Sequence, residues 1–178
     1  IGDMQSVLIE MTNGVSKHDF HKPTDWIERL NLARQGFLQR LAEAENSDSV
    51  PVHPLRICKE VRELFGNDAT ISLDGGDASL FSHMAFDHYH PPYFLFTGPI
   101  GGIGQGVPFA LAGKVARPDH PSVLITGDGS FGYGLIEYDT ALKHNLPIIT
   151  IISSDQAWGI VRHPQIQRYG IERSVATD

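Results

Sequence analysis

The chain has 178 residues, 41% of them hydrophobic, which is enough for one domain with a real core. Its formal net charge is -7 and its acidic and basic residues are interspersed, so neither a nucleic-acid-binding face nor a polybasic membrane patch is expected. No apolar run approaches the roughly 18 residues that a membrane span requires, so a membrane protein is not expected.

The first third of the chain predicts two helices and a break. Residues 2–13 have a short helical pattern, and 14–23 is polar and typical of a linker. Between Thr24 and about Glu45, apolar residues recur every three or four positions, which predicts a long amphipathic helix. The run 46-NSDSVP-51 breaks this pattern, so we place a domain boundary between residues 53 and 54.

From Pro54 onward the chain alternates between strand-like and helix-like periodicity. Strands that are apolar throughout and separated by helices predict a parallel sheet covered on both faces, that is, a three-layer α/β/α fold. In such sheets, ligands bind at the carboxyl ends of the strands. The expected strands are 69–73, 94–96, 122–126 and 147–153, and the expected helices are 54–65, 79–86, a segment ending near 116, and 135–145.

The only cysteine, Cys58, lies in an apolar phase of its helix-like segment. We therefore expect a buried structural thiol rather than a catalytic one. A single cysteine cannot form an internal disulfide, which favours a reducing, cytoplasmic location.

The turn 127-GDGSFG-132 fits the spacing G-x-G-x-x-G and follows an expected strand. Asp155, at the end of the next strand, lies where a ribose-binding acid belongs, so a dinucleotide site is one interpretation. However, the Asp128 carboxylate, about 5 Å from a phosphate, would repel it by roughly 3 kcal/mol at an effective dielectric near 20. A helix N-terminus returns only about 0.3 to 2 kcal/mol.

A divalent cation removes this difficulty. Asp128 and Asp155 are expected at the same end of a parallel sheet, and a cation between them and the phosphates turns repulsion into attraction. Ligation by oxygen alone suits Mg²⁺ or Ca²⁺. The alternative is that both aspartates only cap helices.

The same segment resembles the cofactor motif of the thiamine-diphosphate-dependent enzymes. The resemblance rests on GDGSF, then ALKHNLP, an apolar strand, and 154-SDQAWG-159, and it extends from about Pro54 to the end. Ser154 and Asp155 stand where the family has Asn-Asn, with Asp155 27 positions after Asp128. The resemblance implies the thiamine diphosphate-binding fold, with 54–178 as this domain, incomplete at its C-terminus, and 1–53 as the tail of a middle domain with its connecting helix.

The resemblance also implies a set of site residues. Mg²⁺ would be held by the side chains of Asp128 and Asp155 and the carbonyl of Ala157, with Asp in place of Asn adding a negative charge. The Gly101 carbonyl and the Ile103 backbone would contact the aminopyrimidine, and the Ile103 side chain would support the bent cofactor from below. The expected cofactor-binding residues are Gly76, Asp77, Ala78, Gly101, Gly102, Ile103, Gly127, Asp128, Gly129, Ser130, Phe131, Asp155, Ala157 and Trp158.

Several of these residues have a second interpretation. Asp77 would serve equally as a helix cap, Trp158 as a core residue, and the glycines of 97-TGPIGGIGQG-106 as a loop packed closely on a strand. For the histidines in 83-HMAFDHYH-90, notably His88 and His90, a polar loop is favoured over a zinc site. Glu137 is interpreted as a packing or interface residue.

The resemblance implies an enzyme that acts on small 2-oxo acids. The acetolactate synthase type of decarboxylating carboligation is favoured, with a 2-oxo acid decarboxylase (benzoylformate decarboxylase-like) or a 2-hydroxyacyl-CoA lyase as alternatives. Outside the family, a nicotinamide-dinucleotide oxidoreductase and a non-catalytic scaffold remain as hypotheses.

The resemblance further implies that the chain is not active alone. The glutamate that activates the cofactor comes from the pyrimidine-binding domain of the same or a neighbouring subunit, so no catalytic residue is assigned here and a homodimer or homotetramer is expected. The chain starts at Ile1 rather than Met and ends abruptly, so we expect a piece of a longer protein, whose missing middle domain leaves room for FAD.

Overall fold

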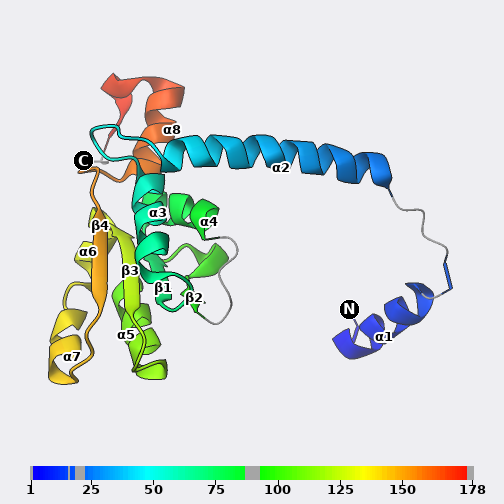
Figure 1. The fold of residues 1–178 in the computed structure, drawn as a ribbon, viewed down its shortest axis with the longest axis horizontal. Coiled ribbons are helices and arrows are strands. Elements are labelled where there is room, and N and C mark those ends of the chain that lie inside the picture. The colour runs from blue at the N-terminus through cyan, green and yellow to red at the C-terminus, as the bar shows by residue number, and fades with distance from the viewer. Residues whose placement is uncertain (1, 16, 19–22, 87–92, 176–178) are drawn as a thin grey trace. The chain divides into compact units, whose positions relative to one another are not determined.

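The computed structural model describes residues 2–15, 17–18, 23–86 and 93–175. The chain divides into two units, residues 1–39 and 40–178, and each is described by itself (Figure 1). Helices predicted in the first third of the chain are present as α1 (Met4–Val15) and α2 (Thr24–Glu45). Within the described residues, no helix is both long and apolar enough to cross a membrane.

Within the described residues, only the last turns of α2 place apolar side chains against a core. No residue of α2 is buried, and apolar side chains near its start, such as Trp26 and Leu30, are about half exposed. Leu41 and Ala44, in the last turns, pack against the core of the second unit. The boundary expected between residues 53 and 54 remains a prediction.

The second unit is built on a sheet of four parallel strands in the order β2-β1-β3-β4. The strands are β1 (Thr70–Asp74), β2 (Phe94–Leu95), β3 (Ser122–Gly127) and β4 (Ile149–Ser153). Asp74 lies opposite Thr126, and Gly127 lies opposite Ser153, so β1, β3 and β4 end at the same edge of the sheet. This arrangement confirms the predicted parallel α/β fold.

Helices cover both faces of this sheet, which completes the three layers (Figure 1). On one face, α3 (Pro54–Phe65) and the end of α4 (Gly76–Ala85) form a core with Ile71, Leu73, Val123 and Ile125. On the other face, α5 (Gly106–Ala116) and α7 (Glu137–Lys143) pack on Leu124. Successive residues of β3 thus point to opposite layers. The expected burial of Cys58 is also confirmed, because it lies in the first of these cores.

The start of α5 approaches the end of β1 closely. The Gly106 N–H donates a 2.7 Å hydrogen bond to Asp74 Oδ2. A Cβ at Gly106 would lie 2.6 Å from the Asp74 Cβ, so only glycine permits this contact. The contact fixes the glycine-rich segment before α5 beside the carboxyl end of the sheet.

The helices around this edge differ from the prediction. The helix expected at 135–145 is present as the shorter α7, and α6 (Asp128–Gly134), which precedes it, was not predicted. The sequence argues against α6 because glycine, which costs about 1 kcal/mol in a helix, occupies four of the eight positions in 127-GDGSFGYG-134. Burial of Ser130 and Gly134 offsets that cost. In addition, α4 begins three residues earlier than expected, and α8 (Gly159–Tyr169) was not predicted.

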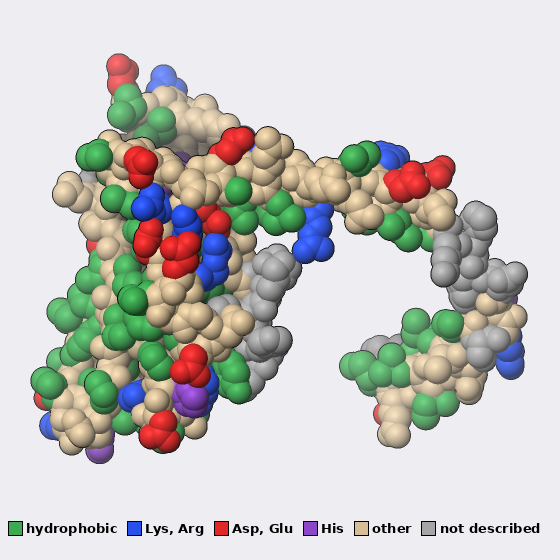
Figure 2. All heavy atoms as spheres, viewed as in Figure 1, with side chains coloured by type: hydrophobic (Ala, Val, Ile, Leu, Met, Phe, Trp, Pro, Cys, Tyr) green, Lys and Arg blue, Asp and Glu red, His purple; other side chains and the backbone are tan. Residues whose placement is uncertain are grey.

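Hydrophobic side chains are exposed on β4 and on the segment that precedes it (Figure 2). Ile149 and Ile152 of β4 are each more than two-fifths exposed although they belong to a strand. Ile136 and Leu142 are about four-fifths exposed. Neighbouring exposed apolar residues of this kind are typical of an interface.

Candidate functional site

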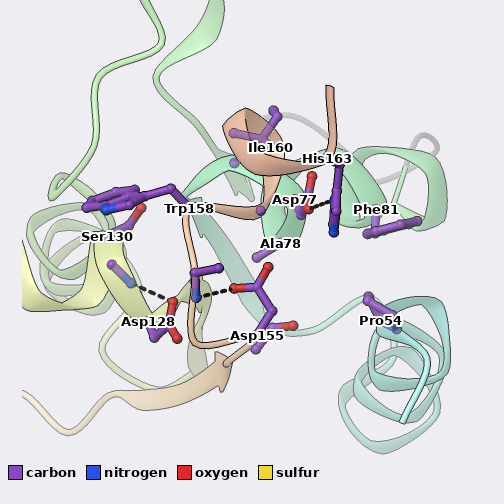
Figure 3. Close-up of a pocket in the computed structure, with 16 residues that line it drawn as sticks. Pro54, Asp77, Ala78, Phe81, Asp128, Ser130, Asp155, Trp158, Ile160 and His163 are labelled. Carbon is purple, nitrogen blue, oxygen red and sulfur yellow. Dashed lines mark hydrogen bonds and ion pairs between the residues drawn. The ribbon is translucent and has the colours of Figure 1, made fainter. Parts of the chain in front are cut away.

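A cavity of about 270 Å³ lies at the carboxyl ends of β1, β3 and β4, where the first turns of α4, α6 and α8 meet (Figure 3). Ten of the fourteen residues predicted from the sequence line it, although they come from three separate segments of the chain. These ten are Gly76, Asp77, Ala78, Gly127, Asp128, Gly129, Ser130, Asp155, Ala157 and Trp158.

Asp128 connects the end of β3 to the loop after β4. Its Oδ2 accepts hydrogen bonds from the Ser154 hydroxyl (2.7 Å) and the Gln156 N–H (3.0 Å), and its Oδ1 accepts one from the Gly129 N–H (2.8 Å). Partial burial raises the pKa of Asp128, but these hydrogen bonds outweigh it and hold the pKa below its ordinary value. Asp128 is therefore an anion at neutral pH, and it contacts the residues on both sides of Asp155.

The loop after β4 turns sharply around Asp155. Gln156 has a φ of 57°, in the left-handed region that is uncommon for residues other than glycine. The Asp155 Oδ1 accepts a 3.1 Å hydrogen bond from the Ala157 N–H. No helix begins at Asp155, and neither Asp77 nor Asp128 occupies an N-cap position, since Gly75 and Gly127 do. Helix capping therefore does not account for the three acids.

Asp77 and Asp155 meet beside the start of α8. A Cβ at Gly159 would lie 2.2 Å from Asp155 Oδ2 and 2.4 Å from Asp77 Oδ2, so both carboxylates reach the space that any other residue would fill. His163, one turn further along α8, places Nδ1 3.0 Å from Asp77 Oδ2 (Figure 3). One ligand atom from each of Asp77, Asp155 and His163 lies within 4.8 Å of the other two.

Two kinds of group line the cavity, and they have opposite electrostatic effects on an anionic ligand. The N-termini of α4 and α8 open into it, and free N–H groups at helix N-termini attract anions. Three carboxylates also line it, and among its described lining residues there is no lysine or arginine. The carboxylates disfavour an anionic ligand in this cavity, and a cation between them and the ligand would offset that repulsion. The carboxylate oxygens are hard ligands of the kind that Mg²⁺ prefers.

A second cavity, of about 440 Å³, adjoins the first. Gly101, Gly102 and Ile103 line it, and it shares Gly76, Ser130, Trp158 and Ile160 with the first cavity. Gly101 has a φ of 65°, which a residue with a side chain rarely adopts. Trp158 lies across Gly129, where a Cβ would be 2.8 Å from the indole ring. Thirteen predicted site residues thus surround two connected cavities.

The fourteenth predicted site residue, Phe131, lines neither cavity. Its ring packs edge-to-face on Tyr138 with the centroids 5.9 Å apart. Glu137 accepts a 2.9 Å hydrogen bond from Thr140 within α7, in agreement with the structural role expected for it. His88 and His90, considered as zinc ligands, lie outside the described residues.

Sequence reasoning missed four residues of the site. Gly159 and His163 belong to α8, and Ser79 and His83 belong to α4 and line the second cavity. The spacing of Gly159 and His163, four residues apart on one helix, was a usable signal once a helix was expected after the loop. Nothing in the pattern of α4 distinguished Ser79 or His83 from ordinary helix residues.

The comparisons with known proteins agree with this geometry. Residues 74–178 match the family model "Thiamine pyrophosphate enzyme, C-terminal TPP binding domain". A probable acetolactate synthase of Mycobacterium bovis is 36% identical over 95% of the chain, which corresponds to 30% of that relative. The 2-hydroxyacyl-CoA lyase 2 proteins of Mus musculus and Homo sapiens are 30% and 28% identical over the same share of the chain, and 27% of each relative is covered.

The chain therefore spans less than a third of the length of these curated relatives. The family match covers more than half of the chain; it begins at Asp74, the last residue of β1, and includes β3 and β4. The chain belongs to the thiamine pyrophosphate enzyme family, and residues 74–178 form its C-terminal TPP binding domain.

Proposed function

We propose that the first cavity binds the diphosphate of thiamine diphosphate through a Mg²⁺ ion held by Asp128, Asp155 and the carbonyl of Ala157. The observation that carries this proposal is the combination of three carboxylates with two helix N-termini and no lysine or arginine among the described lining residues. At about 5 Å and an effective dielectric near 20, each carboxylate–phosphate pair costs roughly 3 kcal/mol, more than a helix N-terminus returns. A divalent cation between the carboxylates and the phosphates turns this repulsion into attraction.

Each acid has a separate role in this arrangement. Asp128 is fixed by Ser154 and Gln156, so its carboxylate is positioned before the metal arrives. Asp155 keeps the ligand oxygen that the family's asparagine would offer and adds a charge, which strengthens metal binding and strains the metal-free site. Asp77 contacts His163, and this contact limits its repulsion of the diphosphate.

The second cavity suits the rings of the cofactor. Ile103, at its wall, is 38% exposed and offers a branched apolar surface on which a bent cofactor can rest. Gly101 lines this cavity without a side chain, and its carbonyl would accept a hydrogen bond from the aminopyrimidine. When bound, thiamine diphosphate supplies a thiazolium that accepts the electron pair released as a 2-oxo acid loses CO₂, and the protein's part is to bind and orient it.

For the whole protein we infer a decarboxylating carboligase of acetolactate synthase type, in line with the name of the mycobacterial relative. A 2-oxo acid decarboxylase or a 2-hydroxyacyl-CoA lyase is the second candidate, which the mammalian relatives favour by name. In the carboligation, the bond between the donor's carboxylate and its carbonyl carbon breaks and CO₂ leaves. The electron pair left behind then forms a bond to the acceptor's carbonyl carbon, whose oxygen takes up one proton.

The remaining parts of the site belong to other regions of the assembly. We propose that residues 54–178 form the thiamine diphosphate-binding domain, and that a glutamate from a pyrimidine-binding domain of the same or a neighbouring subunit activates the cofactor. The exposed apolar residues of β4 and the segment before it support contact with another domain or with a second copy, as in a homodimer or homotetramer. The buried free thiol of Cys58 suits the cytoplasm.

Calorimetric titration of the full-length protein tests the proposal. Thiamine diphosphate should bind at least about 100-fold more weakly when EDTA replaces Mg²⁺, which corresponds to one uncompensated carboxylate–phosphate pair. Asp128→Ala should reproduce this loss in the presence of Mg²⁺. Asp139→Ala is the matched control, because Asp139 is exposed on α7, pairs with Lys143 and lines neither cavity.

NAD⁺ provides the contrasting ligand in the same titration. A dinucleotide site would bind NAD⁺ with and without metal and would gain affinity when Asp128 is removed. That result, or metal-independent binding of thiamine diphosphate, would overturn the proposed function.

A further inference from the structure

The second cavity has an apolar wall that the cofactor motif does not explain. Leu80 of α4, Phe96 after β2, and Ile160 and Val161 of α8 line it opposite the glycine-rich loop. At about 440 Å³ it is larger than the first cavity and falls within the size range of ligand pockets. Its carbon-rich lining favours a ligand with an apolar group well beyond the size of a methyl.

Ser79 is the first polar group in this wall. The residue is 5% exposed, and its Oγ is buried without a hydrogen-bond partner among the described residues. Buried hydroxyls are almost always hydrogen-bonded, so an unpartnered one that lines a cavity points to a ligand atom. Its neighbour on the helix, Ser82, instead turns away from the cavity, with Oγ 3.6 Å from Cys58 Sγ.

His83 is the second polar group, one turn further along the same face of α4. Its ring lies edge-to-face against Phe94 and Phe96, with centroid distances of 5.4 and 4.2 Å. Burial lowers the pKa of His83, so the ring is neutral at physiological pH and has one N–H to donate. Ser79 and His83 together offer two donors on one face of α4, beside the apolar side chains of this wall.

We propose that Ser79 and His83 bind the carboxylate of the acceptor 2-oxo acid, whose branched or aromatic side chain fills the apolar wall of the second cavity. The inference rests on the proposed function for the reaction, and it adds the substrate class. The acceptor keeps its carboxylate throughout carboligation, so a pair of fixed donors serves the acceptor. The donor loses its carboxylate as CO₂, and a site that holds that group tightly would oppose its departure.

Binding of an unreactive analogue tests this assignment without turnover. In the full-length protein loaded with thiamine diphosphate and Mg²⁺, 4-methylpentanoate should bind at least about 30-fold more tightly than acetate, because its extra carbons are buried. Ser79→Ala and His83→Phe should each weaken 4-methylpentanoate binding by about 5- to 30-fold, the effect of one hydrogen bond to a charged group. Ser82→Ala should leave it unchanged, because Ser82 faces Cys58 and does not line the cavity.

A neutral analogue separates recognition from a structural effect. Binding of 4-methyl-1-pentanol, which has the same chain without the carboxylate, should weaken much less in both cavity variants. Equal losses for acid and alcohol would assign Ser79 and His83 a structural role and overturn the inference. So would equal binding of 4-methylpentanoate and acetate.

Cofactor binding is measured on the same preparations, so the two proposals fail separately. If thiamine diphosphate binds with Mg²⁺ and the acid shows no dependence on Ser79 or His83, the substrate assignment fails alone. If the cofactor does not bind, the proposed function fails, and with it the reaction on which the assignment rests.

Discussion

The two cavities share Gly76, Ser130, Trp158 and Ile160 but differ in the chemistry of their other lining residues. The first is lined by three carboxylates at the ends of parallel strands, and the second is lined mainly by carbon, with Ser79 buried and His83 half-buried in its wall. Two sites of different chemistry therefore lie side by side at one edge of the sheet. Charged residues in loops hold a metal and a diphosphate, and helix faces on the other side of Trp158 surround an organic group.

This contrast also explains how far the sequence could predict the site. Asp128 and Asp155 were found because each directly follows an apolar strand, and parallel strands bring their carboxyl ends together. Ser79 and His83 were missed because a serine and a histidine inside a helix carry no local signal. They can be recognised as site residues only in the folded structure, where the segments around Ile103 and Val161 line the same cavity.

The fold was predicted more fully than its details. The four strands and their parallel direction follow from apolar runs separated by helices, and the structure confirms both; the order of the strands was not predicted. The helix starting at Asp128 could not be predicted, because glycine at four of eight positions argues against it locally and only tertiary burial favours it. Phe131 illustrates the limit of a motif, since it belongs to GDGSF and yet packs on Tyr138 away from both cavities.

Of the three substitutions that test this comparison, Gly159→Ala should have the largest effect, and it should act on the first cavity. The new Cβ would overlap Asp155 Oδ2 and Asp77 Oδ2, so both carboxylates must move away from the metal site. Magnesium-dependent binding of thiamine diphosphate should fall by about 10- to 100-fold, a size typical of displaced supports of metal ligands. Calorimetry with Gly132→Ala as the control checks this, because a Cβ at Gly132 would meet no atom within 4 Å. Equal affinities in the two variants would contradict the placement of Asp155.

A smaller effect is expected from Asp155→Asn, which keeps the ligand oxygen and removes one charge. The affinity for Mg²⁺ should fall by about 3- to 10-fold, because one carboxylate no longer attracts the cation. The thermal unfolding midpoint of the metal-free protein should rise, since Asp77 and Asp155 no longer repel each other beside Gly159. Differential scanning calorimetry with and without Mg²⁺ measures both effects. A lower midpoint without metal would show that the charge of Asp155 is not a source of strain.

The smallest effect concerns pH and the hydrogen bond between Ser154 and Asp128. Because the native pKa of Asp128 is lowered, its contribution to stability is complete above the ordinary aspartate pKa of about 3.9 and is lost as the pH falls through the native value. Ser154→Ala removes one donor and should raise the native pKa toward the ordinary value. The stability that depends on this carboxylate should then be smaller at neutral pH by less than about 1 kcal/mol, and its loss on acidification should be smaller and should end at a higher pH. Urea unfolding across a pH series measures the free energy of unfolding; a larger acid-dependent loss in Ser154→Ala than in the unsubstituted protein would contradict this role for Ser154.

The central claim is that a metal ion joins the carboxylates of the first cavity to the diphosphate. Pulsed electron paramagnetic resonance of the full-length protein with Mn²⁺ in place of Mg²⁺ tests it most directly, because hyperfine coupling to ³¹P reports phosphate oxygens bound to the metal. The account predicts ³¹P coupling when thiamine diphosphate is added, and its loss in Asp128→Ala but not in Asp139→Ala. Tightly bound cofactor without ³¹P coupling, or coupling that survives the loss of Asp128, would contradict it.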